Sequence, residues 1–237
     1  FLFCNYVLGS FAYFYVYKLK KDRFKNHKIQ KEEPTKESIL VDIKWSSLSM
    51  VIYVVIAYVL ILLINHGYTK VYFDISEHST SYFIFTVILF ACLQDTHFYW
   101  GHRFMHSHRT IFKYTHAVHH ANKNPTPFTN FSFSPLENII LGLYFILMCL
   151  FIPVHIYTVM AVFIINSIGN TIGHLGYELS TPNMNKMLDK IFINSIHHNM
   201  HHKYGYLNYG LYFPFWDKVM NTFHHKYCFL NIILNLI

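Results

Sequence analysis

Eight histidines form three short clusters whose spacing is typical of metal ligands. The clusters read His102-Arg-Phe-Met-His106, His116-Ala-Val-His119-His120 and His198-Asn-Met-His201-His202. Positions i, i+3 and i+4 share one face of a helix, so each cluster is expected to point two or three imidazoles in one direction. Neutral imidazole is the commonest protein ligand for a transition metal. Because eight converging imidazoles are too many for one ion, the pattern predicts a site for two metals.

A lone histidine on a helix is more often a packed or surface residue than a ligand. We keep that ordinary interpretation for the histidines outside the clusters, namely His27, His66, His78, His97, His108, His155, His197, His224 and His225. Three clusters at helical spacing are hard to obtain by chance in a chain with only 13% charged residues. Metal binding is therefore the favoured interpretation.

The composition indicates a membrane protein, because 53% of the residues are hydrophobic and a span needs about 20 mostly apolar residues. Four regions qualify, at 1–17, 48–64, 82–100 and 139–166. The last region is too long for one span, and Pro153 in its middle predicts a hairpin of two short helices. A soluble core helix fits poorly with four such regions. The expected fold is all-α, with about four to five membrane helices.

The distribution of charge predicts the orientation in the membrane. Residues 18–36 contain eight Lys or Arg and three acids, whereas Lys70 is the one base in the 65–80 loop. The positive-inside rule places the 18–36 loop in the cytoplasm. The chain then crosses, returns, and crosses twice more through the hairpin. All three histidine clusters are therefore expected at the cytoplasmic face.

The net charge of +7 comes largely from the same loop and suits anionic lipid headgroups. No nucleic-acid motif is present, so no nucleic-acid partner is expected. The cysteines form no CxxC pair and no disulfide framework. We expect one structural domain, in which residues 1–80 supply N-terminal membrane helices and the basic loop, and residues 81–225 the catalytic region. The apolar residues 228–237 carry no motif, and their role stays open.

Two acids and a ninth histidine are further candidates for the site. Asp95 lies seven residues before His102 and so on roughly the same helical face. An acid at membrane depth is costly and usually functional, and its expected role is to accept the free ring N–H of a ligand histidine. The alternative is pairing with Arg103 or solvation at the interface. His174, with Glu178 one turn later, is the ninth candidate ligand.

Two segments are expected near the clusters without a fixed role. Residues 121–136 are rich in proline and predict a loop that crosses near the site. Glu137 follows this loop and is interpreted either as a partner of a ligand or as an acid at a helix N-terminus. The aromatic stretch 204–216 either closes over a lipid substrate or lies in the interfacial aromatic belt.

In this order, the motifs resemble the fatty acid hydroxylase superfamily, which includes sterol desaturases, sterol C4-methyl oxidases, fatty acid 2-hydroxylases and carotenoid hydroxylases. The resemblance covers about residues 90–222 and rests on the combined pattern. Besides the three clusters, it is carried by the run 94–103, Pro135-Leu-Glu137, Gly173-His174-x-Gly-Tyr177-Glu178, Asn208-Tyr-Gly210 and Trp216-Asp217. The sequence around the motifs is most similar to the sterol desaturase and C4-methyl oxidase branch, including its bacterial members.

This resemblance implies a membrane-bound oxygenase with two non-haem iron ions, which uses O2 to hydroxylate or desaturate a C–H bond of a sterol-like or fatty acyl lipid. The implied ligands are His102, His106, His116, His119, His120, His174, His198, His201 and His202, with Asp95 and Glu178 supporting them. Zinc binds imidazole sites more tightly than ferrous iron. A purified sample that holds zinc would therefore not contradict an iron enzyme. No cytochrome b5-like segment is present, and a separate cytochrome b5- or ferredoxin-type donor is expected to supply electrons. The implied location is a bacterial inner membrane or the endoplasmic reticulum.

Other functions fit the sequence less well. A carotenoid hydroxylase is the nearest alternative. The short gap between His106 and His116 argues against a membrane acyl-CoA desaturase, in which these boxes are far apart. A membrane zinc hydrolase would typically carry HExxH, which is absent from the sequence. A metal transporter would spread its ligands over several spans near the middle of the membrane.

Overall fold

The protein is described here from a computed structural model, which covers residues 2–180, 184, 187, 188 and 190–224. His225 and the apolar stretch 228–237 lie outside the described residues. The longer helices are α1 (Leu2–Tyr13), α3 (Lys36–Asn65), α4 (Thr80–His106), α6 (Pro135–Phe151) and α7 (Ile156–Gly173). The shorter ones are α2 (Lys21–Phe24), α5 (Arg109–Tyr114), α9 (Ser195–Tyr204) and α10 (Phe215–Val219). The predicted all-α class is confirmed, and the chain adds one two-residue parallel strand pair, β1 (Val71–Tyr72) with β2 (Val154–His155).

Three helices are long and apolar enough to cross a membrane, namely α3, α4 and α7, and α6 is a shorter apolar helix. Their outward faces are apolar: Val51, Val54 and Tyr58 on α3 are each more than half exposed. Such a surface would be costly in water and suits lipid, which confirms a membrane protein. The α3 helix begins at Lys36, twelve residues before the predicted span, because Thr35 caps it by accepting the N–H of Ser38.

The predicted hairpin at 139–166 is present as α6 and α7. The α6 helix ends at Phe151, just before Pro153, whose ring cannot continue a helix. Between the two helices, β2 pairs with β1 in the loop that joins α3 to α4. The first predicted span, at 1–17, forms α1 and then a π-helix at Phe14–Leu19. With 12 residues, α1 rises only about 18 Å, short of a hydrocarbon core of about 30 Å.

The ends of the helices that carry the site are set by local capping. Ser79 accepts the N–H of Tyr82 at the start of α4. At the start of α6, Ser134 accepts the N–H of Glu137, and Pro135 occupies the first turn, where its missing N–H costs nothing. The α9 helix ends at Gly205, whose φ of 75° suits glycine.

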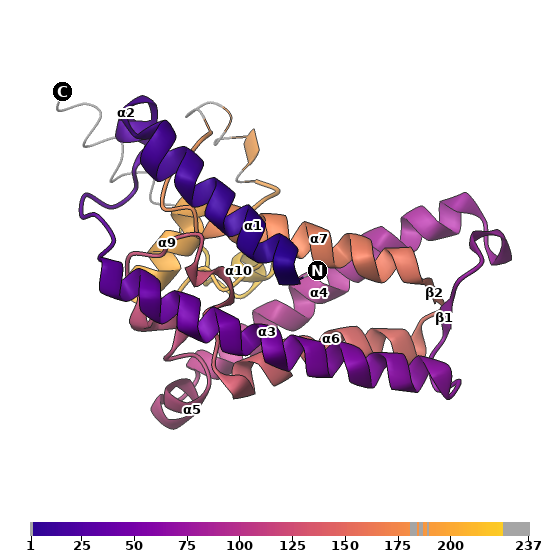
Figure 1. Cartoon of the computed structure of the whole chain (residues 1–237). Coiled ribbons are helices and arrows are strands. Elements are labelled where there is room, and N and C mark those ends of the chain that lie inside the picture. Colours follow the sequence, from indigo (N-terminus) through magenta and orange to yellow (C-terminus); the bar gives the residue numbers. More distant parts are fainter. Residues whose placement is uncertain (1, 181–183, 185–186, 189, 225–237) are drawn as a thin grey trace.

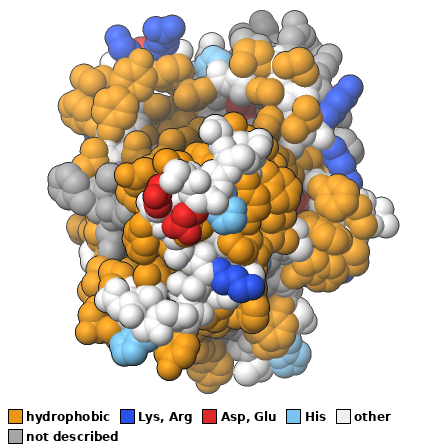
Figure 2. Space-filling model, turned by 90° about the vertical axis from the view of Figure 1, so that its right-hand side faces the viewer, with side chains coloured by type: hydrophobic (Ala, Val, Ile, Leu, Met, Phe, Trp, Pro, Cys, Tyr) orange, Lys and Arg blue, Asp and Glu red, His pale blue; other side chains and the backbone are white. Residues whose placement is uncertain are grey.

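The long helices run lengthwise and converge on one end of the molecule (Figure 1). The strands β1 and β2 lie at the right-hand end of that view, whereas α5, α9 and α10 lie at the left-hand end. Figure 2 shows the strand end, where hydrophobic side chains surround a small polar patch. At 27 residues, α4 is about 40 Å long. That length exceeds the hydrocarbon core and carries the last turns of α4 toward the α9 end.

A polar seam fixes the first half of α3 to the loop 122–134, which is where the sequence predicted a loop near the site. The buried carboxylate of Asp42 accepts from Asn122 Nδ2 at 2.8 Å and from Thr129 Oγ1 at 2.7 Å. Further along α3, Ser49 Oγ accepts from Asn138 Nδ2 on α6 at 2.8 Å. This seam holds in place the segment that directly follows the second histidine cluster.

Candidate metal centre

The nine candidate histidines come together at the end of the molecule that carries α9. They form two groups, in each of which one ring nitrogen per residue lies within 4.8 Å of all the others. We call these histidine group 1 (His102, His106, His116, His120 and His201) and histidine group 2 (His119, His174, His198 and His202). Each group could hold a metal ion. All nine predicted residues are therefore in the two groups, and no further His, Cys, Asp or Glu of the described chain joins them.

The groups do not follow the three sequence clusters. His119 and His120 are neighbours in sequence, yet His119 belongs to group 2 and His120 to group 1. His201 and His202 are divided in the same way. Each cluster still sends two imidazoles, four residues apart, into one group, namely His102 with His106, His116 with His120, and His198 with His202. The third member of the second and third clusters joins the other group, because neighbouring residues on a helical turn point in different directions.

The backbone fixes which ring nitrogen of the histidines carries the proton. His102 Nδ1 lies 2.9 Å from the carbonyl oxygen of Tyr209, and His201 Nδ1 lies 2.7 Å from that of Leu207. In group 2, His174 Nδ1 lies 2.8 Å from the carbonyl of Asn170, and His202 Nδ1 lies 3.2 Å from that of Asn122. A carbonyl oxygen only accepts, so each of these Nδ1 atoms donates, and each Nε2 keeps a free lone pair.

These lone pairs point into the groups. The Nε2 atoms of His102 and His116 are 2.9 Å apart, and those of His174 and His198 are 2.8 Å apart. His102 and His174 donate their protons to carbonyls, so each directs an Nε2 lone pair at a second imidazole nitrogen. Such an arrangement suits a cation bound by both rings. The donor set of each group thus fits a metal ion bound through Nε2 atoms.

Burial keeps the rings in the form that a metal requires. His119 and His202 are almost fully buried. Removal from water lowers the pKa of His116, His119 and His202 well below the usual imidazole range, and the neighbouring histidines lower it further. The rings are therefore neutral at physiological pH. Metal ligands must be deprotonated in the same way.

Glu137 is the carboxylate that touches a histidine of the site. Its Oε1 atom lies 2.5 Å from His116 Nδ1, and its side chain is fully buried in the first turn of α6. Both interpretations that the sequence left open for Glu137 therefore hold. A carboxylate behind a ligand histidine fixes the ring and makes the other nitrogen a stronger donor to metal.

Asp95 and Glu178 do not have the expected contact with a ligand histidine. Asp95 Oδ1 instead accepts three backbone N–H groups, from Leu211, Tyr212 and Phe213, at 3.3, 2.7 and 3.1 Å. Glu178 Oε1 accepts from the backbone and hydroxyl of Ser180 at 3.0 and 2.7 Å. Asp95 ends up away from the rings because the loop after α9 packs against its face of α4.

The aromatic stretch 204–216 has a role that the sequence did not suggest. Its backbone supplies the carbonyls that orient His102 and His201. Asp217 holds the stretch in shape by accepting the N–H groups of Tyr209 and Gly210 at 2.9 and 2.8 Å. From the sequence, Asp217 is visible only as part of the Trp216-Asp217 motif. Its role could not be predicted, because the backbone N–H groups that it accepts are present at almost every residue.

Comparison with known proteins identifies the family of this chain. The fatty acid hydroxylase family model matches residues 87–222, more than half of the chain.

The chain belongs to the fatty acid hydroxylase family.

Two relatives of this fatty acid hydroxylase family member are about one third identical to it. A Delta(7)-sterol 5(6)-desaturase of Schizosaccharomyces pombe is 31% identical over 66% of this chain and 50% of the relative. The lathosterol oxidase of Homo sapiens is 32% identical over 68% of this chain and 52% of the relative. That of Rattus norvegicus is 29% identical over 89% of this chain and 67% of the relative. The chain thus spans about half the length of the first two relatives, and no solved structure matches it.

An apolar cavity adjoins both histidine groups of this family member. It is lined by Tyr53, Gln94, His97, Phe98, Phe131, Phe133, Leu141, Phe145, Phe163, Asn166 and Asn170. The Phe98 ring lies 5.0 Å from that of His102, and the Phe133 ring lies 5.0 Å from that of His119. We call this space the inner chamber. Its position beside both groups was not predictable from spacing.

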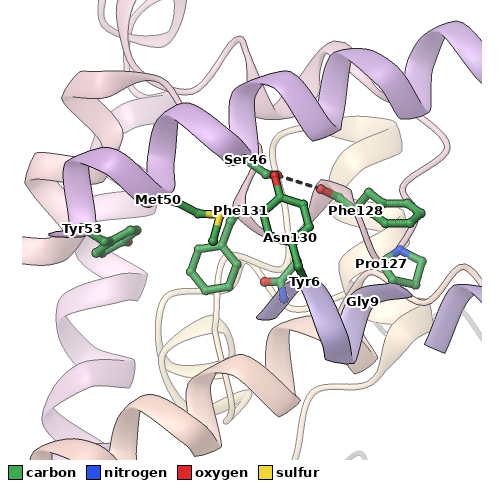
Figure 3. A pocket seen from close by; sticks show the side chains of 9 residues that line it. All are labelled: Tyr6, Gly9, Ser46, Met50, Tyr53, Pro127, Phe128, Asn130 and Phe131. Atoms are coloured by element: carbon green, nitrogen blue, oxygen red, sulfur yellow. Dashed lines mark hydrogen bonds between the residues drawn. The ribbon is translucent and has the colours of Figure 1, made fainter. Parts of the chain in front are cut away.

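A second hollow lies between α1, α3 and the loop 127–131 (Figure 3). Tyr53 and Phe131 line this outer groove and the inner chamber alike. Their rings meet edge to face with centroids 5.9 Å apart. The two hollows are therefore separated by one pair of aromatic side chains.

Proposed function

We propose that this protein is a membrane-bound, O2-dependent lipid oxidoreductase of the sterol desaturase type, with two metal ions at histidine groups 1 and 2. The observation that carries this proposal is the pair of buried imidazole groups, whose Nε2 lone pairs converge beside an apolar chamber. Membership of the fatty acid hydroxylase family supports the same reaction class.

The nine histidines are assigned as ligands through their Nε2 atoms, five to one ion and four to the other. Held by these neutral imidazoles, two metal ions would supply the redox chemistry that couples O2 reduction to C–H oxidation. Imidazole ligands suit iron as well as zinc or copper, and we assign iron because membership of the fatty acid hydroxylase family implies it. Glu137 orients His116, and the carbonyls of Leu207 and Tyr209 orient His201 and His102.

The rest of the chain excludes water and positions the substrate. Aromatic side chains make up most of the wall of the inner chamber, so a lipid displaces little bound water when it enters. A bound lipid lies beside Phe98 and Phe133, which contact His102 and His119. Since two relatives are named as a sterol desaturase and a lathosterol oxidase, we favour desaturation of a sterol over hydroxylation of a fatty acyl chain.

The substrate enters sideways from the bilayer through the outer groove (Figure 3). The groove is lined by α1 and by the part of α3 that carries Ser46, Met50 and Tyr53. Because Tyr53 and Phe131 separate the groove from the inner chamber, rotation of these two rings would join the two spaces. A nonpolar substrate would then reach the centre without crossing water.

The histidine end is assigned to the cytoplasmic side, on the basis of the basic residues in 18–36. A cytoplasmic centre is accessible to a separate electron donor, which we assign to the cytochrome b5 or ferredoxin type.

The proposal is tested by metal analysis and lipid analysis of the purified protein and of membranes that contain it. We expect about two metal ions per chain and an O2-dependent oxidised sterol when sterol and an electron donor are present. His119→Ala should remove group 2 metal and the product. His66→Ala is the matched control, because His66 is an exposed histidine at the opposite end of α3. Metal content and product that do not change in His119→Ala would overturn the proposal.

A further inference from the structure

The inner chamber is lined mainly by apolar and aromatic side chains, and three amide side chains form one wall of it. Gln94 on α4 and Asn166 and Asn170 on α7 line that wall, and each is at least 92% buried. Both helices are candidate spans. Polar side chains inside a membrane segment are costly and mark functional positions.

The hydrogen bonds of these amides are only partly used. Gln94 Oε1 accepts from the hydroxyl of Tyr212 at 2.8 Å, and Asn166 Oδ1 accepts from Asn170 Nδ2 at 2.9 Å. Within the described part of the chain, no partner contacts the amide nitrogens of Gln94 and Asn166 or the Oδ1 atom of Asn170. Buried polar atoms are normally paired, so this wall has room for a polar group of a ligand.

We propose that Gln94, Asn166 and Asn170 bind the hydroxyl group of the lipid substrate. This inference rests on the proposed function and specifies its substrate class. The two amide N–H₂ groups donate to the hydroxyl oxygen, and Asn170 Oδ1 accepts its proton. A carboxylate would fit poorly, because no Lys or Arg is among the described residues that line the chamber and a buried charge needs a partner.

The position of the wall limits the kind of lipid. The backbone carbonyl of Asn170 accepts from His174 Nδ1, so the wall borders histidine group 2 directly. A hydroxyl held there would place the carbons next to it in the chamber, where Phe98 and Phe133 contact the rings of His102 and His119. A ring lipid oxidised near its hydroxyl fits this arrangement, and a sterol has such a hydroxyl. A long acyl chain oxidised far from its head group does not.

The test compares two probes, a radiolabelled Delta(7)-sterol and the same sterol without its hydroxyl, in binding to the purified, metal-loaded protein in detergent. Wild-type protein should bind the sterol roughly tenfold more tightly, as expected for a buried hydrogen-bonded hydroxyl. Gln94→Met and Asn166→Leu, which keep the approximate size of each side chain, should reduce this preference to about one- to twofold. Leu141→Met is the matched control, which changes the same chamber without touching its polar wall and should keep the full preference.

Metal content is measured on every variant, so that loss of the centre is separated from loss of hydroxyl recognition. Equal binding of the two probes by wild type, or a preference that survives Gln94→Met and Asn166→Leu together, would overturn the inference. Turnover of a lipid with O2 tests the proposed function independently. Hydroxyl preference without turnover would overturn the proposed oxidoreductase function and support the hydroxyl-binding wall. Turnover without hydroxyl preference would support the proposed function and overturn the hydroxyl-binding wall.

Discussion

At the scale of single residues, each candidate ligand histidine has one ring nitrogen that faces away from the metal centre. The group that contacts this nitrogen determines how the ring is held. His102, His174 and His201 each give the Nδ1 proton to a backbone carbonyl, whereas His116 has the carboxylate of Glu137. A carbonyl fixes the tautomer and the ring plane. A carboxylate does the same and also adds negative charge behind the ring, which raises its basicity toward a metal.

Glu137→Gln should therefore weaken the centre with little change in fold. The amide keeps an oxygen for His116 but removes the charge, and loss of such a partner typically reduces metal affinity or activity 10- to 100-fold, roughly. Metal retained against a graded series of chelator concentrations measures the effect.

Glu178→Gln is the matched control for that substitution. Glu178 is also a buried glutamate, but its carboxylate contacts Ser180 and no histidine. We expect its metal retention to equal that of wild type. Equal losses in both variants would mean that Glu137 acts on general stability rather than on His116.

Asp95 is predicted to stabilise the fold rather than to assist a ligand. Removal of its carboxylate in Asp95→Ala leaves three backbone N–H groups of residues 211–213 without an acceptor. The free energy of unfolding should fall by roughly 2–3 kcal/mol, and thermal unfolding of the purified protein in detergent measures it. Asp74→Ala removes a loop acid that is exposed and should change the stability much less. Similar unfolding temperatures for the two variants would contradict this role.

At the scale of elements, α3 connects the membrane to the centre. Its first half is fixed by Asp42 and Ser49 to the loop and helix that follow the second histidine cluster. Its Met50 and Tyr53 line the outer groove, whereas Val51 is 60% exposed on another face. One helix thus anchors the loop near the ligands and borders the proposed lipid entrance.

Met50→Trp should fill the outer groove and slow lipid turnover several-fold, while the metal content stays at the wild-type level. Val51→Trp places the same bulk one residue further along, on a surface that faces away from the groove, and should leave turnover near wild type. Initial rates at several substrate concentrations measure the change. If both variants have wild-type rates, the lipid reaches the chamber by another route.

For the whole molecule, the arrangement of charge along the chain predicts its orientation. The basic residues of 18–36 and the strand end of the molecule belong to opposite ends of α3. Figure 1 shows the strands at one end of the molecule, and Figure 2 shows a small polar patch within an apolar surface at that end.

Cysteines introduced at the two ends test this orientation in intact cells or sealed vesicles. Lys31→Cys should react with a membrane-impermeant thiol reagent only after access to the cytoplasmic side, whereas Ser76→Cys should react from the opposite side. In the parent chain for the labelling, serine replaces the exposed Cys92 and also Cys4 and Cys228, and the buried Cys149 is kept. The reverse pattern of labelling would overturn the assigned topology.

Much of this architecture could be predicted from local sequence. Apolar length predicted the helices α3, α4 and α7, and Pro153 predicted the break between α6 and α7. The spacing of histidines selected eight members of the two groups, and the family resemblance added His174. These features are readable because helix periodicity and proline stereochemistry act over a few residues.

Only the tertiary structure decided how the histidines divide between the groups and what supports them. His119 and His120 separate, as do His201 and His202, because neighbouring residues on a helical turn point in different directions and the packing of the elements decides which group each ring joins. Asp95 contacts no ligand histidine, because the loop after α9 donates its N–H groups to the carboxylate. Glu137 does contact one, because His116 of the second histidine cluster lies beside it. The backbone carbonyl of Tyr209, 107 residues away in sequence, orients His102. Such acceptors exist at every residue, so no residue type records which one a fold will use.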